Sequence, residues 1–186
     1  MVYLPVNVQG WIQTSTGIKF FPLEPQIEDI YIQDIAHALS NLCRFGGHCS
    51  EFYSVAQHSV EVAQIVPKEY ALWGLLHDAS EAYLVDIPRP LKPFLKEYLT
   101  FESQLMYCIC KKFNLPLECP KSVEIADDIV LATETRDLMK SAHITWETYL
   151  PEGESLLTHS IIPLTPKESY KLFMAMFSNT VFKGKI

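Results

Sequence analysis

The stretch from Ala56 to Asp86, AQHSVEVAQIVPKEYALWGLLHDASEAYLVD, constrains the fold more than any other part of this sequence. It has the pattern of two helices separated at Pro67, with apolar residues at the three- and four-residue spacing of a helix face. His58 and the adjacent pair His77-Asp78 stand where a buried core would prefer leucine. Buried imidazoles and carboxylates are costly unless they are paired or bind a cation. The stretch therefore predicts a helical protein that holds a metal ion.

Helical periodicity dominates the chain after about residue 30, and we predict an all-α fold. Two helix starts carry the sequence of a capping box, Ser54 with Gln57 and Thr165 with Glu168. Further helices are predicted from about 32, from about 68, over 93–113 and over 121–141, and a proline-rich loop is predicted over 85–93.

A length of 186 residues predicts one domain spanning 1–186, with a motif-bearing core at about 30–140. Hydrophobic residues make up 48% of the chain and charged residues 20%, which is typical of a folded globular protein. Residues 11–13 and 18–20 flank a Thr-Ser-Thr-Gly turn and predict a short hairpin before the helices.

The net charge of −7 disfavours binding to a nucleic-acid polymer, but a small anionic substrate is compatible with it if a bound cation supplies the attraction. No apolar run approaches the roughly 20 residues of a membrane span, and the N-terminus does not resemble a secretory signal. We therefore expect a cytoplasmic protein without a membrane partner. The five cysteines lack the spacing of a disulfide framework or a thiolate metal site. The apolar face of helix 93–113 packs either internally or against a second copy, which leaves a homo-oligomer open.

A mononuclear metal site needs about one more ligand besides His58, His77 and Asp78. The segment KSVEIADDIVLATETRDL offers two neighbouring aspartates. Asp127 shares a helix face with apolar residues, whereas Asp128 lies on the more polar side. We prefer Asp127, because an aspartate on an apolar face needs a partner or a metal. The competing interpretation is that each histidine is an ordinary core residue satisfied by hydrogen bonds.

These motifs resemble the HD-domain phosphohydrolase superfamily, whose metal motif is His, then His-Asp, then a distant Asp. QHSVEVA at 57–63 and HDASEAYLVDIPRPLK at 77–92 are similar to segments of the bacterial 5'-deoxynucleotidases. DIAHALSNLCRFGGH and FYSVAQHS are similar to bacterial and phage-encoded members that include the dATP triphosphohydrolases. The resemblance covers about residues 11–140 and implies a single-domain HD-type helical bundle.

Carried over position by position, the resemblance implies metal ligands at His58, His77, Asp78 and Asp127. It assigns Glu81 and Asp86 to catalysis and its support, and Arg44 to the substrate phosphate. Two departures stand out: the gap between the two histidines is shorter than in the bacterial 5'-deoxynucleotidases, and Val85-Asp86 replaces Gly-Asp. The mixed His and Asp ligand set admits Co, Mn, Zn, Fe or Mg.

Each remaining candidate has a functional and an ordinary interpretation. Glu81 is a general acid or base, or a solvent-exposed helix glutamate. Asp86 orients another group, binds a second cation or caps the loop. Lys92 contacts phosphate or is merely solvated. His48 contacts phosphate or only lines the cleft. Phe45 is a candidate to stack on the base of a nucleotide. For Trp73, we favour a place in the core over such stacking.

The resemblance implies a metal-dependent enzyme that removes 5'-phosphates from deoxynucleotides, with dATP or dAMP converted toward deoxyadenosine. Two alternatives stay open, a nucleotide 5'-phosphatase without base preference and a non-catalytic helical domain that uses the metal for stability. If the protein is phage-encoded, we expect it in the host cytoplasm. The sequence leaves open whether the phosphates leave singly or as triphosphate.

Overall fold

The computed structural model describes residues 10–140 and 150–183, and it is mostly helical, which confirms the all-α prediction. The longer elements are α1 (Ile32–Asn41), α2 (Val55–Ile65), α3 (Ala71–Leu76), α4 (Glu81–Leu84), α5 (Lys96–Phe113), α6 (Lys121–Leu138) and α7 (Pro166–Lys183). Short 3₁₀ turns lie at Ile27–Asp29, Arg44–Gly47, Lys68–Tyr70 and Lys92–Phe94. The prediction of one domain over 1–186 extends beyond the described residues and stays a prediction.

The predicted hairpin is present as two short antiparallel strands, β1 (Ile12–Gln13) and β2 (Lys19–Phe20). Its turn is fastened to α1 by the buried carboxylate of Asp34. That carboxylate accepts hydrogen bonds from Ser15 Oγ at 2.6 Å, Thr16 N at 2.8 Å and Thr16 Oγ1 at 2.7 Å. The hairpin thus adds Phe20, which is fully buried, to the helical core.

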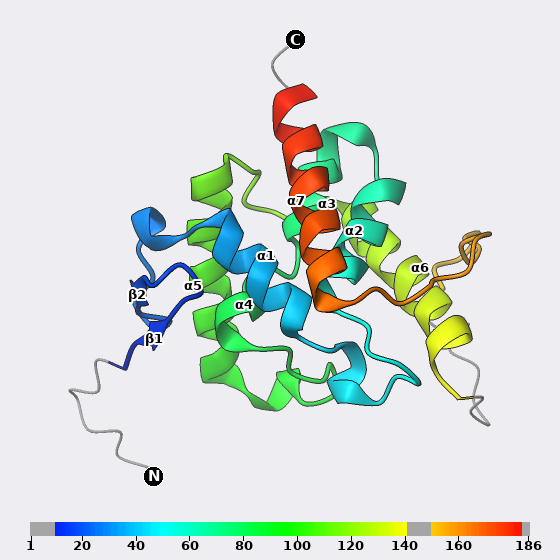
Figure 1. Ribbon diagram of the computed structural model, residues 1–186, viewed down its shortest axis with the longest axis horizontal. Coiled ribbons are helices and arrows are strands. Elements are labelled where there is room, and N and C mark those ends of the chain that lie inside the picture. Colours follow the sequence, from blue (N-terminus) through cyan, green and yellow to red (C-terminus); the bar gives the residue numbers. More distant parts are fainter. Residues whose placement is uncertain (1–9, 141–149, 184–186) are drawn as a thin grey trace.

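Helix α2 lies at the centre of the helical packing, because it contacts α1, α3, α6 and α7. In Figure 1, α7 crosses the middle of the molecule beside α2 and α3, while α5 and α6 lie on opposite sides. Side chains from distant parts of the chain meet in one apolar core. Its fully buried members include Phe20, Ile35, Leu39, Val55, Leu75, Leu76, Leu105, Ile109 and Phe173.

Local signals in the sequence account for most helix boundaries. Ser54 Oγ accepts the Gln57 N–H at 3.1 Å and so caps α2. At the start of α7, Glu168 accepts hydrogen bonds from the backbone and hydroxyl of Thr165, and the Glu168 N–H reaches Thr165 Oγ1 at 3.4 Å. The contacts at the start of α7 confirm the predicted capping box in full. At the start of α2 only the N-cap is confirmed, because the Gln57 side chain bonds the backbone of Ile162 and Leu164 instead.

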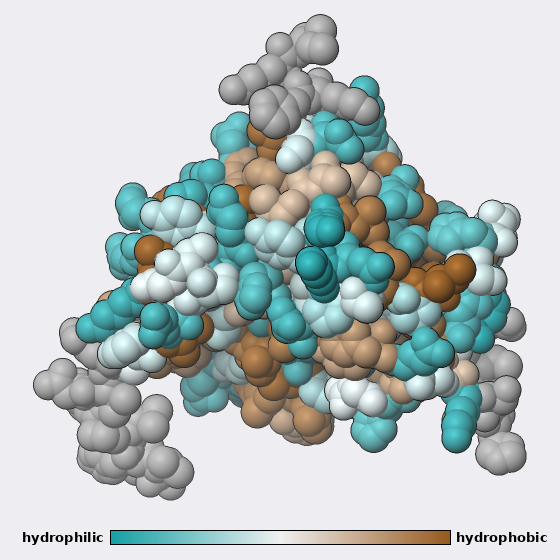
Figure 2. Space-filling model, in the orientation of Figure 1, coloured by the Kyte–Doolittle hydropathy of each residue, from teal (hydrophilic) through white to brown (hydrophobic). Residues whose placement is uncertain are grey.

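The surface drawn in Figure 2 mixes hydrophilic and hydrophobic residues without a single apolar band. Within 10–140 and 150–183, none of the helices combines the length and the apolar character that crossing a bilayer requires. Trp73 is buried and donates its indole N–H to the Pro116 carbonyl at 2.9 Å, which confirms its predicted place in the core.

Candidate metal centre

His58 is presented by α2, a helix whose residues are mostly buried. It lies one turn into α2, on the face that packs against the rest of the core, and its side chain is fully buried. Its Nδ1–H donates to Glu134 Oε1 at 2.6 Å. With Nδ1–H bound in this way, Nε2 is the ring nitrogen that a cation would bind in place of a proton.

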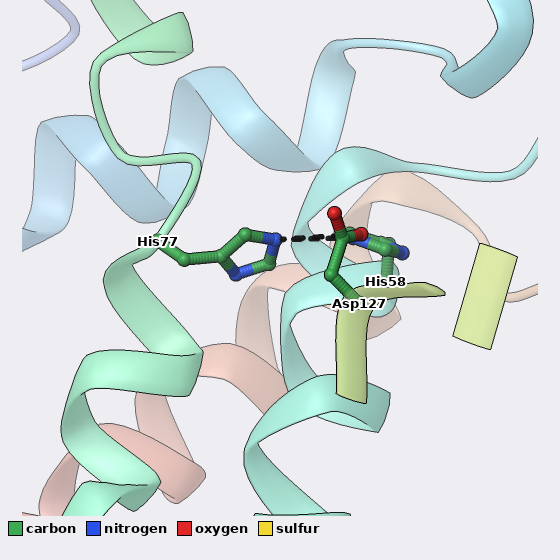
Figure 3. Close-up of side chains that lie close together, drawn as sticks. All are labelled: His58, His77 and Asp127. Atoms are coloured by element: carbon green, nitrogen blue, oxygen red, sulfur yellow. Dashed lines mark hydrogen bonds and ion pairs between the residues drawn. The ribbon is translucent and has the colours of Figure 1, made fainter. Parts of the chain in front are cut away.

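His77 is brought opposite His58 by the close packing of α3 on α2. Gly74 makes this approach possible, since a Cβ there would lie 3.1 Å from Ala63 Cα and 3.2 Å from Val66 Cγ2. The His77 Nδ1–H donates to the Gly74 carbonyl at 2.7 Å. The two Nε2 atoms of His58 and His77 are then 3.2 Å apart and face each other (Figure 3).

The helix predicted from about residue 68 would include His77 and Asp78, and the structure corrects this expectation. Helix α3 ends at Leu76, and residues 77–80 form a turn before α4. The Gly74 carbonyl, which would accept the Asp78 N–H in a continuing helix, is used by the His77 ring. The turn continues with i to i+3 bonds such as Glu81 N to Asp78 O at 3.0 Å. Because α3 ends at Leu76, the side chains of His77 and Asp78 can come together, and His77 Nε2 lies 3.3 Å from Asp78 Oδ2.

The two aspartates complete a cluster of four side chains. Asp127 Oδ1 lies 3.2 Å from His58 Nε2 and 3.9 Å from His77 Nε2. Asp78 Oδ2 lies 3.3 Å from His77 Nε2 and 3.7 Å from His58 Nε2. Asp127, rather than Asp128, faces the histidines, as the helix-face argument predicted.

These distances fit one shared cation. Ligands at about 2.1 Å from an ion are at most about 4.2 Å apart, and two nitrogens are about 3.0 to 3.4 Å apart for cis-octahedral to tetrahedral angles. The His58 to His77 separation of 3.2 Å falls in that interval, and each distance from an aspartate oxygen to a histidine Nε2 stays below the upper limit. Ligand atoms of His58, His77 and Asp127 all lie within 4.8 Å of one another. The group can therefore hold a metal ion.

The electrostatics of the cluster also favour a cation. Burial and the neighbouring Arg44 oppose the charged form of His58, yet Glu134 and Asp127 raise the pKa of His58 to about 10. Burial opposes ionisation of Asp127, but the hydrogen bond and charge of His58 lower the pKa of Asp127 to about 2. The pKa of Asp78 is lowered mainly by His77 against the effect of burial. These shifts show that the carboxylates favour positive charge at the two histidines, and a divalent cation would supply that charge.

The cluster lies at one side of a cleft with a volume of about 790 Å³, a size typical of small-molecule sites. Polar side chains from the loops after α1 and α4 line it. Its lining comprises Arg44, Phe45, Gly46, His48, Asp78, Glu81, Asp86, Ile87, Pro88, Arg89, Pro90, Lys92, Asp127, Leu131 and Met139. All of the residues predicted for catalysis or substrate binding line this one cleft.

Glu81 is buried, which rules out its interpretation as a solvent-exposed glutamate. Its Oε2 is buried and has no hydrogen-bond partner within the described part of the chain. Burial first, and then the charges of Asp78 and Asp86, raise the pKa of Glu81 to about 9. The carboxyl group is thus protonated at neutral pH and can donate a proton into the cleft.

The other predicted residues differ in how strongly contacts within the protein already occupy their side chains. Arg44 is largely committed to the protein, because Nη2 donates to Glu134 at 3.1 Å and Nη1 lies 3.8 Å from Asp78 Oδ2. Lys92 is paired with Glu102 of α5 at 2.9 Å and is therefore not simply solvated. The exposed His48 and the half-buried Asp86 and Phe45 line the cleft, and Phe45 adopts a left-handed backbone with φ of 54°. The Arg44 guanidinium lies 5.5 Å from the Phe45 ring centroid.

Comparison with known proteins places the chain among bacterial relatives of uncharacterized function. No protein-family model matches it. Protein YfdR of Escherichia coli (strain K12) is 43% identical over 172 residues, which cover 91% of this chain and 95% of YfdR. The chain belongs to the YfdR family. A protein of Rhodobacter capsulatus is 29% identical over 144 residues, which cover 70% of this chain and 74% of that protein.

The sequence pattern did not indicate two residues of this site. Glu134 is fully buried and joins His58 to Arg44. Arg89, in the proline-rich loop, donates to Asp127 Oδ2. Glu134 could have been found, because it lies seven residues after Asp127 and hence on the same face of α6. Nothing in the local sequence indicates the pairing of Arg89.

Proposed function

We propose that the protein is a divalent-metal-dependent phosphohydrolase of the HD-domain type that removes 5'-phosphate groups from deoxynucleotides. The observation that carries the proposal is the convergence of His58, His77, Asp78 and Asp127 beside a cleft that also contains the buried Glu81. The order His, His-Asp, Asp along an all-α chain supports the HD-domain assignment.

The four clustered side chains would hold the cation. When bound, a divalent cation supplies a Lewis acid for a phosphoryl group and lowers the pKa of a water molecule. Glu134 and the Gly74 carbonyl accept the two Nδ1–H groups, so that Nε2 of each histidine is the atom that would bind the cation in place of a proton. The chain thus orients both imidazole rings toward the cation.

Glu81 is suited to proton transfer. A carboxyl group whose pKa is about 9 carries its proton at neutral pH and can give it to the oxygen that leaves phosphorus. A domain that used the metal only for stability would not need a buried carboxyl oxygen that has no hydrogen-bond partner among the described residues, and such an oxygen costs folding free energy. Glu81 therefore favours the catalytic interpretation over the non-catalytic one.

The cleft also offers charge and an aromatic surface for a nucleotide. Arg44 and Lys92 line it and provide positive charge for phosphate, although each is also paired with an acid. Phe45 provides a ring on which a base can stack, and His48 lies near it in the same lining. We propose dATP or dAMP as substrates, with deoxyadenosine as the product.

A panel of deoxynucleotides and ribonucleotides, assayed with Co, Mn, Zn, Fe and Mg, tests this proposal by product chromatography. We expect release of phosphate or triphosphate from dAMP or dATP, and loss of that release in Asp127→Asn and Glu81→Gln. Lys121→Ala serves as the control, because Lys121 is exposed on α6 and pairs only with Glu124 among the described contacts. Equal rates with all bases would favour a general 5'-phosphatase, and no release with any substrate or metal would contradict the proposal.

A further inference from the structure

The basic residues that line the cleft differ in how firmly the protein holds them. The Arg44 side chain is only 12% exposed and pairs with the fully buried Glu134. The Lys92 side chain is 29% exposed and pairs with Glu102. The Arg89 side chain is 59% exposed, although its Nη2 lies 3.1 Å from Asp127 Oδ2 and its Nη1 lies 3.2 Å from Asp128 Oδ1. Exposed ion pairs contribute little to stability, so Arg89 can exchange its partners at the lowest cost.

The backbone around Arg89 is held in place, so an exchange of partners involves the side chain alone. Pro88 and Pro90 flank Arg89 and reduce the conformational freedom of this segment, and the Leu91 N–H closes a turn across Arg89 by donating to the Pro88 carbonyl at 2.8 Å. The loop begins at Val85, whose φ of 62° is rare for a β-branched residue. The Val85 carbonyl accepts the hydroxyl of Tyr98 from α5 at 2.9 Å, which fastens this end of the loop. The guanidinium is therefore presented at the cleft by a fixed support.

A bound cation would change the balance of charge around Arg89. Asp127 uses Oδ1 toward the two histidines and Oδ2 toward Arg89. A divalent cation at the cluster would take up the charge of Asp127 and repel the guanidinium. Asp128, which is partly exposed, would remain as its weaker partner. A guanidinium in this position has the planar fork that binds phosphate through two hydrogen bonds.

We propose that Arg89 binds phosphoryl oxygens of the substrate, and that it exchanges Asp127 and Asp128 for the phosphate when the cation is bound. This inference rests on the proposed function, because it assigns the phosphate-binding residue of the same cleft. Asp128 is then a competitor of the substrate for Arg89. The competition distinguishes this role from a structural one, in which Asp128 and Arg89 act together.

Two substitutions should change substrate affinity in opposite directions. With dAMP at saturating cation, we expect Arg89→Ala to raise KM about tenfold or more, since it removes charged hydrogen bonds to phosphate. Arg89→Lys should restore part of the affinity. Asp128→Asn should lower KM, because it frees the guanidinium. If Arg89 only fastened the loop, Arg89→Ala and Asp128→Asn would break the same contact and both would raise KM. That result, or an unchanged KM in Arg89→Ala, would overturn the inference.

Calorimetric titration with inorganic phosphate separates this inference from the proposed function. In the presence of Mg²⁺, the unaltered protein and the Lys121→Ala control should bind phosphate about tenfold more tightly than Arg89→Ala. If they do so but hydrolyse no nucleotide, Arg89 is a phosphate-binding residue and the proposed function fails. If nucleotides are hydrolysed but Arg89→Ala binds phosphate as tightly as the unaltered protein, the inference fails and the proposed function stands. Phosphate that binds none of these proteins also overturns the inference.

Discussion

Glu134 supports the candidate metal centre from behind, and its replacement by glutamine gives a sharp prediction. Its carboxylate has no exposure to solvent and accepts two hydrogen bonds, from His58 Nδ1 at 2.6 Å and from Arg44 Nη2 at 3.1 Å. The amide of glutamine has one oxygen and one NH₂ group, so it can accept from one donor while its NH₂ group faces the other. The substitution thus loses at least one hydrogen bond to a charged group and leaves Arg44 with less compensation.

The loss of one such bond corresponds to about 1.5 to 3 kcal/mol, and an uncompensated buried charge raises the cost to about 3 to 5 kcal/mol. For a chain of this length, about 3 kcal/mol lowers Tm by roughly 6 to 12 °C. A mispositioned His58 should also weaken Mn²⁺ binding about 10- to 100-fold. Thermal unfolding by circular dichroism and calorimetric titration with Mn²⁺ measure the two effects.

The matched control is Glu124→Gln, a substitution of the same chemistry on the same helix. The Glu124 side chain is about half exposed and pairs with Lys121 at 2.7 Å, so we expect a change below about 0.5 kcal/mol. If Glu134→Gln kept the Tm and the Mn²⁺ affinity of the unaltered protein, the argument that Glu134 orients His58 would be wrong.

Three further predictions follow from other parts of the structure. Asp34→Asn should detach the hairpin from α1 and cost about 1.5 to 3 kcal/mol in chemical denaturation. Burial opposes the charge of Asp34, but hydrogen bonds from Ser15 and Thr16 lower its pKa in the folded protein. The ionised Asp34 therefore stabilises the fold fully above about pH 4, and this stabilisation is lost as the pH falls through the lower folded-state pKa. If Asp34→Asn showed the same loss of stability at acidic pH as the unaltered protein, this reasoning would be wrong. Gly74→Ala should push α3 away from α2 and destabilise the fold by about 1 to 3 kcal/mol, of which the higher helix propensity of alanine offsets roughly 1 kcal/mol. The substitution should also weaken Mn²⁺ binding, because it separates the two histidines. An unchanged Mn²⁺ affinity would show that the close approach of the helices is not needed. Glu81→Gln should lower kcat about 100-fold or more while leaving Mn²⁺ affinity within a factor of a few, and a fully active variant would exclude Glu81 from proton transfer.

The sequence was informative where the structure depends on local patterns. The capping residues Ser54 and Thr165 mark helix starts through contacts within three residues. The choice of Asp127 over Asp128 follows from the 3.6-residue period, because the neighbours on each face of α6 are visible in the sequence. Each of these predictions needs only geometry that a single helix supplies.

Features that depend on distant partners could not be predicted in this way. The side chain of Gln57 does not complete the capping box of α2. It bonds the backbone of Ile162 and Leu164, which lie more than 100 residues away in the chain. Helix α3 ends early because the His77 ring takes the Gly74 carbonyl, an interaction that depends on the position of the ring in the packed fold. Neither the helical periodicity nor the resemblance stated in the sequence analysis gave any sign of Glu134 or Arg89.

Diffraction from crystals grown with Mn²⁺ tests the central claim most directly, since the anomalous signal locates the ion independently of any activity. The account predicts one strong peak about 2.1 to 2.3 Å from His58 Nε2, His77 Nε2 and Asp127 Oδ1, with Asp78 as a further ligand. A peak elsewhere in the molecule, or no peak at millimolar Mn²⁺, would contradict it.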